Sequence, residues 1–369
     1  MYFLYLFQPE TRRVSEETAS DGQTTLYQPS EQALTRLIRL QNGCQSEQDK
    51  GFTLTHNQTR IRYDYSRTAN LSVCSVPKAG STLVTLVLLA LELPKGTDVR
   101  RIFQTKRSLV HAQSTGYLRK TVEDESRPTR NVIVARDPYR RLFSAYVDKQ
   151  ILRLPIRDAN NSSKLLCGNH LTFEQYLHFI VSSGFKGRFV DRHVAPVTLL
   201  CKACEKKYQY VAKQETLSAD LMFLLKNITN VPEDTREAIW SLLNREVDEK
   251  TIKGVVETVV ARAADVCSNM PEFTSSLWSV FQLQGILRTD AVFPLEYFKR
   301  LRIIDGAAVT DIILKTISSY PLSNAERRRQ RNEAVVKAYA GVSPLTIRGI
   351  QNMFFKDFLL FGYDIYPPS

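Results

Sequence analysis

A short basic loop between two apolar runs constrains the fold of this chain more than any other feature. Residues 71–76 form the first run and residues 83–91 the second, and residues 77–82, Pro-Lys-Ala-Gly-Ser-Thr, separate them. The pattern predicts a strand, a tight loop and a helix. Backbone N–H groups point outward at such a helix start, and the helix dipole favours negative charge. The junction is therefore suited to binding an anion.

The side chains of the loop favour the same ligand. Lys78 supplies a full positive charge, Gly80 would let the backbone approach a ligand closely, and Ser81 and Thr82 add hydroxyl donors. The loop lacks the spacing GxxxxGK[ST], so it is not the usual nucleotide-triphosphate loop. An ordinary basic turn at a helix start is the competing interpretation. The candidate anion-binding residues are Pro77, Lys78, Ala79, Gly80, Ser81 and Thr82.

A second unit of the same kind follows. Residues 131–135 predict a buried strand that ends at Arg136, with Asp137 as the N-cap and Pro138 as the first residue of a helix. Arg136 then lies at the carboxyl edge of the sheet, where open α/β sheets bind ligands, and its guanidinium suits a phosphate group. Ser144 follows about two helical turns later and is a second candidate donor. The competing roles are a structural salt bridge and a small packing residue.

These two units together resemble the pair of sites with which sulfotransferases bind 3′-phosphoadenosine 5′-phosphosulfate. Residues 191–196, DRHVAP, and the later segment that ends in AKQETL at residue 217 resemble the Golgi carbohydrate sulfotransferases. So does the closing segment FFKDFLLFGY, residues 354–363. That family includes the chondroitin and dermatan 4-O-sulfotransferases. The resemblance covers roughly residues 31–365.

The resemblance implies a fold and an activity. We expect an α/β fold like that of a P-loop kinase, with a mainly parallel sheet flanked by helices and a helical C-terminal part. Residues 31–365 would form the sulfotransferase domain, and residues 1–30 a flexible tail. The activity would be sulfate transfer to a glycan hydroxyl, of chondroitin or dermatan type, without a metal. Lys78 would stabilise the leaving group, and Arg136 and Ser144 would hold the 3′-phosphate.

The acceptor hydroxyl must lose a proton, and histidine is the natural base near neutral pH. His193 lies in the segment that resembles the family, and we predict that it is the base. His111 and Glu215 are the alternatives. A histidine without a catalytic role is the simplest competing interpretation.

The net charge of +12 suits anionic partners. The donor and a glycosaminoglycan are both polyanions, and the chain carries no zinc-finger or RNA-binding signature, so we expect an anionic glycan and no nucleic acid as partner. Two other functions remain open. One is a non-catalytic relative that binds sulfated glycans, and the other is a small-molecule kinase on the same core fold.

The even number of cysteines permits disulfides, which are typical of an oxidising lumen. Cys74 lies in the first predicted strand and would alternatively be a buried free thiol. The spacing of Cys201 and Cys204 alone is weak evidence for zinc. N-glycosylation sequons also indicate a secreted glycoprotein, though weakly, since sequons arise by chance. They begin at Asn57, Asn70, Asn160, Asn161 and Asn227.

The resemblance implies a type II membrane protein with its catalytic part in the Golgi lumen. No anchor is visible, because residues 1–7 are apolar but a spanning helix needs about 20 residues. Elsewhere the periodicity predicts helices within residues 31–41, 172–181, 233–265 and 291–318. Ser218 would cap a further helix over residues 219–226, and residues 345–358 would close the domain. Residues 227–300 carry no functional signal.

Overall fold

The computed structural model describes residues 31–369, except for several segments within that range. These segments are residues 47–61, 95–96, 104–109, 111–117, 121–129, 156–163, 169, 184–190, 227, 229–230 and 245–248. The predicted tail, residues 1–30, also lies outside the described residues, as do His111 and the sequons at Asn57, Asn160, Asn161 and Asn227.

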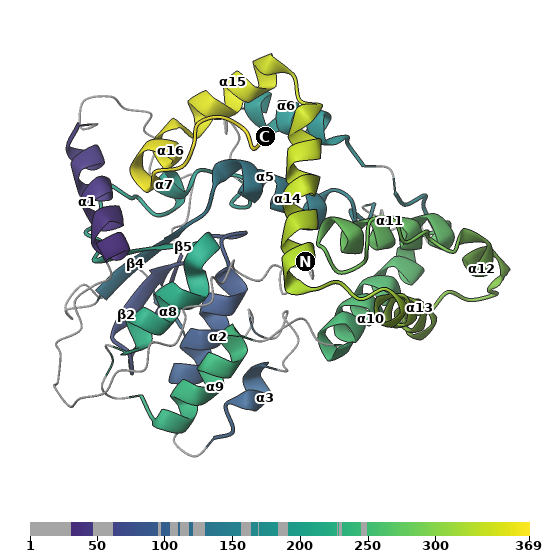
Figure 1. Ribbon diagram of the computed structural model, residues 1–369, viewed down its shortest axis with the longest axis horizontal. Coiled ribbons are helices and arrows are strands. Elements are labelled where there is room, and N and C mark those ends of the chain that lie inside the picture. The colour runs from purple at the N-terminus through teal and green to yellow at the C-terminus, as the bar shows by residue number, and fades with distance from the viewer. Residues whose placement is uncertain are drawn as a thin grey trace.

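A mixed sheet forms the centre of the molecule (Figure 1). Within the described residues it has five strands, in the order β3-β1-β2-β4-β5. Strands β2, β4 and β5 are parallel, whereas β1 is antiparallel to both of its neighbours. The predicted α/β fold with a mainly parallel sheet is confirmed. The strands are β1 (Tyr63–Ser66), β2 (Leu71–Cys74), β3 (Arg119–Lys120), β4 (Arg130–Ala135) and β5 (Tyr210–Lys213).

Helices flank the sheet, and the crossovers explain its parallel core. Helix α2 (Ser81–Leu91) follows β2, and helix α5 (Pro138–Lys149) follows β4, so each helix begins at the carboxyl end of a central strand. Strand β4 is rich in β-branched residues, and residues 132–135 are buried, as expected for a strand covered on both faces. The other helices of this part are α1 (Glu31–Ser46), α3 (Arg100–Phe103), α6 (Phe173–Ser183), α7 (Val197–Leu200), α8 (Leu217–Lys226) and α9 (Glu233–Leu243).

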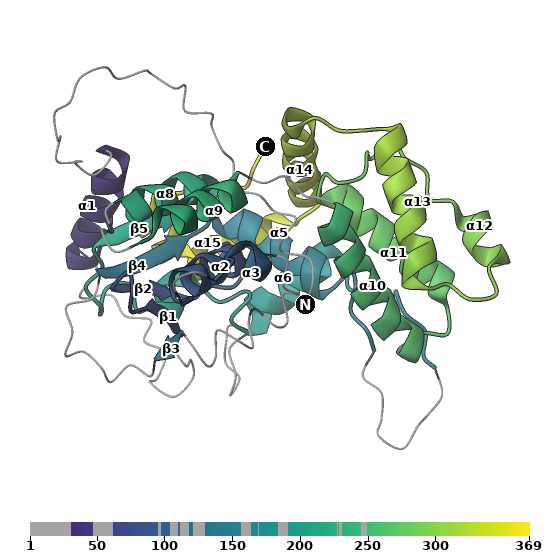
Figure 2. The same cartoon turned by 90° about the horizontal axis from the view of Figure 1, so that it is seen from below.

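A helical lobe, residues 249–319, lies to one side of the sheet (Figure 2). It contains α10 (Glu249–Val266), α11 (Met270–Leu283), α12 (Leu295–Arg300) and α13 (Gly306–Ser319). Helix α10 buries one apolar face, which includes Ile252, Val256 and Val260. This i, i+4, i+8 spacing is that of an amphipathic helix packed on one side. Two helices, α12 and α13, replace the single helix expected within residues 291–318.

The C-terminal helices return the chain from the lobe to the sheet region. They are α14 (Asn324–Ala340), α15 (Pro344–Met353) and α16 (Phe355–Phe361). The carboxylate of Asp357, on α16, accepts hydrogen bonds from the backbone N–H groups of Val197 and Thr198 at the start of α7, at 2.7 and 2.8 Å. The predicted helical C-terminal part is confirmed by these helices, and it contacts α7, which directly follows residues 191–196.

All six cysteines lie in described residues, and they form three disulfides. The prediction of disulfides is confirmed. Cys74 pairs with Cys201 and is therefore not a free thiol, and Cys204 pairs with Cys44. The Cys201–Cys204 spacing thus reflects two different disulfides rather than a zinc site. The third disulfide joins Cys167 to Cys267.

Other local predictions differ from the structure. Strand β1 lies within residues 42–70, a polar stretch whose lack of periodicity predicts neither a helix nor a strand. Ser218 is inside α8 rather than at its cap, and its hydroxyl donates to the Leu243 carbonyl at 3.1 Å. None of the helices in the described residues is long and apolar enough to span a lipid bilayer.

Candidate active site

The basic loop joins β2 to α2 through two residues in the left-handed conformation. Lys78 has φ +68° and Gly80 has φ +80°. A left-handed lysine is strained, and such residues concentrate at functional sites. A Cβ atom at Gly80 would lie 2.3 Å from Cδ2 of Leu217. The positive φ therefore favours glycine at position 80, and a side chain there would also displace the end of the Leu217 side chain, a contact that the sequence did not indicate.

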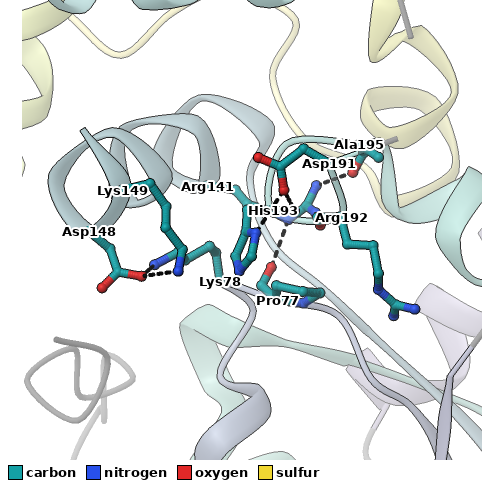
Figure 3. Close-up of polar contacts among 9 residues, drawn as sticks. All are labelled: Pro77, Lys78, Arg141, Asp148, Lys149, Asp191, Arg192, His193 and Ala195. Carbon is teal, nitrogen blue, oxygen red and sulfur yellow. Dashed lines mark hydrogen bonds and ion pairs between the residues drawn. The ribbon is translucent and has the colours of Figure 1, made fainter. Parts of the chain in front are cut away.

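The side chain of Lys78 is buried and forms an ion pair with Asp148 on α5. Lys149, the next residue of α5, places its ammonium 3.6 Å from the same Asp148 carboxylate oxygen. Figure 3 shows the two lysines converging on this carboxylate. The loop that was predicted from sequence thus meets the second predicted unit through a charged contact.

Arg136 is brought to the same loop, as the sheet topology predicted. It follows the last residue of β4, and its Nη1 donates to the carbonyl oxygen of Lys78 at 2.7 Å. Burial lowers the pKa of Arg136 to about 10, and the nearby Glu215 carboxylate opposes the shift. The guanidinium remains charged at neutral pH. Asp137 caps α5, accepting a hydrogen bond from the Arg140 N–H at 2.8 Å, as predicted.

Ser144 lies two turns into α5 and is buried. Its hydroxyl finds no hydrogen-bond partner among the described residues. A buried hydroxyl is normally paired, so an unpaired one on the helix that also carries Asp148 fits a donor to a bound ligand.

Arg141 is a site residue that the sequence reasoning missed. Its guanidinium donates to the carbonyls of Pro77 at 3.1 Å, Ala195 at 2.5 Å and Arg192 at 2.9 Å (Figure 3). Burial lowers the pKa of Arg141 to about 10, which leaves it charged. The arginine ties the basic loop to residues 191–196. Ser144 and Asp148 follow Arg141 by three and seven residues, so all three lie on one face of α5. This polar stripe is the sequence pattern from which Arg141 could have been identified.

His193 lies at the partly exposed end of this cluster. Its Nδ1 is 2.7 Å from the Asp191 carboxylate, and its backbone N–H donates to the same oxygen at 2.9 Å. A carboxylate there assigns the proton to Nδ1 and leaves Nε2 as a base. Burial lowers the pKa of His193, against the effect of the Asp191 hydrogen bond, and the charges of Lys78 and Lys149 lower it further. The neutral form is thus favoured.

Glu215, an alternative base, is engaged on both oxygens. One accepts the N–H of Asp137 at 3.1 Å, and the other accepts the hydroxyl of Tyr363 at 2.9 Å. This arrangement makes Glu215 a brace between the start of α5 and the closing segment. Through Glu215, the segment that ends in AKQETL contacts both the start of α5 and the closing segment of residues 354–363.

The arrangement brings together a candidate anion-binding loop, a buried ammonium and a candidate base. Such a set can stabilise negative charge on a leaving group and remove a proton from an attacking hydroxyl. Among the described residues, no group of three or more His, Cys, Asp or Glu side chains is placed to hold a metal ion.

Comparison with known proteins identifies relatives of the chain. A family model described as "Sulfotransferase family" matches residues 62–287, more than half of the chain. Carbohydrate sulfotransferase 9 of Homo sapiens is 23% identical over 198 residues, which are 47% of this chain and 44% of the human protein. The chain therefore aligns with less than half of that relative's length. No solved structure matches the chain significantly.

Proposed function

The chain belongs to the sulfotransferase family, and we propose that it transfers sulfate from 3′-phosphoadenosine 5′-phosphosulfate to a hydroxyl group of a glycan. The observation that carries the proposal is the meeting of the two predicted units. Arg136 holds the carbonyl of Lys78 at 2.7 Å, and Ser144 presents a hydroxyl that is unpaired among the described residues. A donor with two separate anionic groups needs two cationic sites at one sheet edge.

Each residue has a role in the proposed transfer. His193 accepts the proton of the acceptor hydroxyl at Nε2 as the hydroxyl oxygen bonds to sulfur. Lys78 meets the negative charge that develops on the bridging oxygen as the bond between sulfur and that oxygen breaks. The N–H groups of Gly80, Ser81 and Thr82 assist, because helix starts stabilise anions. The products are the sulfated glycan and adenosine 3′,5′-bisphosphate.

Donor selectivity is assigned to the second unit. Arg136 and Ser144 hold the 3′-phosphate, the group that distinguishes this donor from simpler nucleotides. Arg136 is buried and its guanidinium stays charged, so it offers a desolvated and therefore strong phosphate contact.

The proposed acceptor is an anionic glycan of the chondroitin or dermatan type. The net charge of +12 and the carbohydrate sulfotransferase relative support this class. We also place the protein in the Golgi lumen, an oxidising compartment in which three disulfides would persist.

Donor binding is the first test. Adenosine 3′,5′-bisphosphate should raise the midpoint of thermal unfolding, because a ligand that binds the native state stabilises it by mass action. ATP with magnesium should not. A rise with ATP alone would favour a kinase. No rise with either compound would contradict the donor assignment.

Sulfate transfer to desulfated chondroitin and dermatan is the second test. Lys78→Ala should lose about two to three orders of magnitude in turnover, as other oxyanion donors do. Arg136→Ala should weaken adenosine 3′,5′-bisphosphate far more than adenosine 5′-monophosphate. Lys315→Ala, which removes an exposed lysine of the helical lobe, is the matched control. Donor binding without transfer to any glycan would indicate the non-catalytic relative.

A further inference from the structure

The buried ion pair between Lys78 and Asp148 points to a role for the carboxylate. We propose that Asp148 is a positioning residue, which keeps the Lys78 ammonium charged and aimed into the site until the donor takes its place as the partner of that ammonium. The inference rests on the proposed function, because it concerns the lysine assigned to the leaving group.

Both side chains of the ion pair are buried. The side chain of Lys78 is fully buried, and that of Asp148 is 3% exposed. A buried ammonium loses its proton readily unless a nearby anion compensates for the lost hydration. Among the described residues, the carboxylate of Asp148 is in direct contact with this ammonium. Since leaving-group stabilisation needs a charged lysine, the carboxylate is needed although it touches no reacting atom.

The surrounding charges make that need greater. The ammonium of Lys149, on α5, lies 3.6 Å from the Asp148 carboxylate. The charge of Lys78 lowers the pKa of His193. Arg136 and Arg141 bind the carbonyls of Lys78 and Pro77. The acidic groups that face these residues are Asp148 on α5, Asp191 beside His193, Asp137 at the start of α5, Glu215 bound to the Asp137 N–H, and Asp357 on α16, whose charge acts on Arg141. The described surroundings of Lys78 are therefore rich in cations, and Asp148 is the carboxylate paired with it.

The position of Asp148 couples its role to donor binding. Asp148 lies four residues after Ser144, one turn further along the same face of α5. Helix α5 thus carries both the proposed 3′-phosphate donor and the counter-ion of Lys78. A bound donor would bring a phosphate oxygen to the Lys78 ammonium. The ammonium would then exchange its carboxylate partner for that oxygen while staying buried.

The pH profile of Asp148→Asn tests the proposal, because asparagine keeps the shape and removes the charge. At neutral pH we expect turnover to fall about 10- to 100-fold, with partial recovery toward acid pH. The reason is that a buried ammonium without its paired anion loses its proton more readily, so activity gains a new alkaline limb. Asp148→Glu should restore much of the wild-type profile, and Asp311→Asn, at an exposed ion pair, is the control.

A purely structural role for Asp148 would lower activity at every pH without moving the alkaline limb, and that result overturns the proposal. A double-mutant cycle on unfolding, with Lys78→Met, Asp148→Asn and the double variant, gives a readout that does not depend on activity. Additive effects would also overturn it. If the wild-type protein transfers no sulfate but the cycle shows coupling, the ion pair stands and the proposed function fails.

Discussion

Charged side chains have different surroundings in the helical lobe, residues 249–319, and in the sheet region, which is the described part of the chain outside the lobe. In the sheet region Lys78, Arg136, Arg141, Asp148 and Asp357 are all buried. Residues 249–319 are all described, and none of the charged side chains there is buried. The ion pairs within the lobe join exposed groups, such as Lys253 with Glu257 and Lys315 with Asp311.

The difference separates two uses of charge. Burying a charge costs several kcal/mol unless partners compensate, so a chain keeps buried charges only where they bridge segments or bind ligands. Exposed pairs contribute little to stability, and they keep a surface soluble. Four of these five buried charges meet at the loop of residues 77–82, where Arg136, Arg141 and Asp148 contact Pro77 or Lys78. This convergence distinguishes the candidate site from the lobe.

Arg141→Met should produce the largest effect. It removes a guanidinium that donates to the carbonyls of Pro77, Arg192 and Ala195, and with it these three hydrogen bonds. We expect a loss of roughly 3–5 kcal/mol in unfolding free energy, the range for breaking a buried charged network, and loss of activity. Lys315→Met in the lobe is the matched control and should not move the denaturant midpoint. Equal midpoints for the two variants would break the comparison.

His193→Ala should be next in size, with an effect on turnover rather than on folding. Removing a general base costs about two to four orders of magnitude, whereas His178→Ala, at an exposed position on α6, should cost nothing. The neutral imidazole is the active form, and burial lowers its pKa from the ordinary 6.5. Activity should therefore fall on the acid side only below that pH. Wild-type turnover in His193→Ala, or an acid limb above 6.5, would contradict the assignment.

Local patterns in the sequence predicted both strand–loop–helix units and the sheet edge at which they lie. The strand that ends at Arg136, the cap at Asp137 and the loop of residues 77–82 depend on neighbours in the chain, so their periodicity and turn residues suffice. Strand β1 was missed because its sequence is polar and its extended conformation depends on pairing with β2. A pattern within one segment does not show which other segment it pairs with.

Long-range contacts explain the other omissions. Asp148 reads as an ordinary surface carboxylate near a helix end, and only its contact with Lys78, 70 residues away in the chain, reveals a buried ion pair. The role of Glu215 is likewise fixed by Tyr363, 148 residues away. The disulfide pairing has the same character, since spacing alone cannot choose among the possible connectivities.

The disulfide between Cys167 and Cys267 links the two regions, and breaking it measures how far they depend on each other. It closes a loop with a sequence separation of 100, and Cys167 also exchanges hydrogen bonds with Asn269 at 2.7 and 2.8 Å. Replacing both cysteines by serine should cost about 2–5 kcal/mol of unfolding free energy. Donor binding should persist, because the donor residues lie in the sheet region. Loss of bisphosphate binding in a folded variant would show that the lobe shapes the donor site.

The smallest effects compare two buried side chains with unpaired polar atoms, one in each region. Ser144 on α5 and Gln284 at the end of α11 both lack partners for these atoms among the described residues. Gln284→Leu should raise stability by about 1–3 kcal/mol, since it removes an unpaired buried amide, and should leave activity unchanged. Ser144→Ala should not lower stability but should weaken adenosine 3′,5′-bisphosphate binding by about 1 kcal/mol, the value of one hydrogen bond. Unfolding curves and ligand titrations of both variants decide the matter. If both variants changed only stability, the unpaired Ser144 hydroxyl would be a packing defect like that of Gln284, and it would no longer support a ligand at the sheet edge.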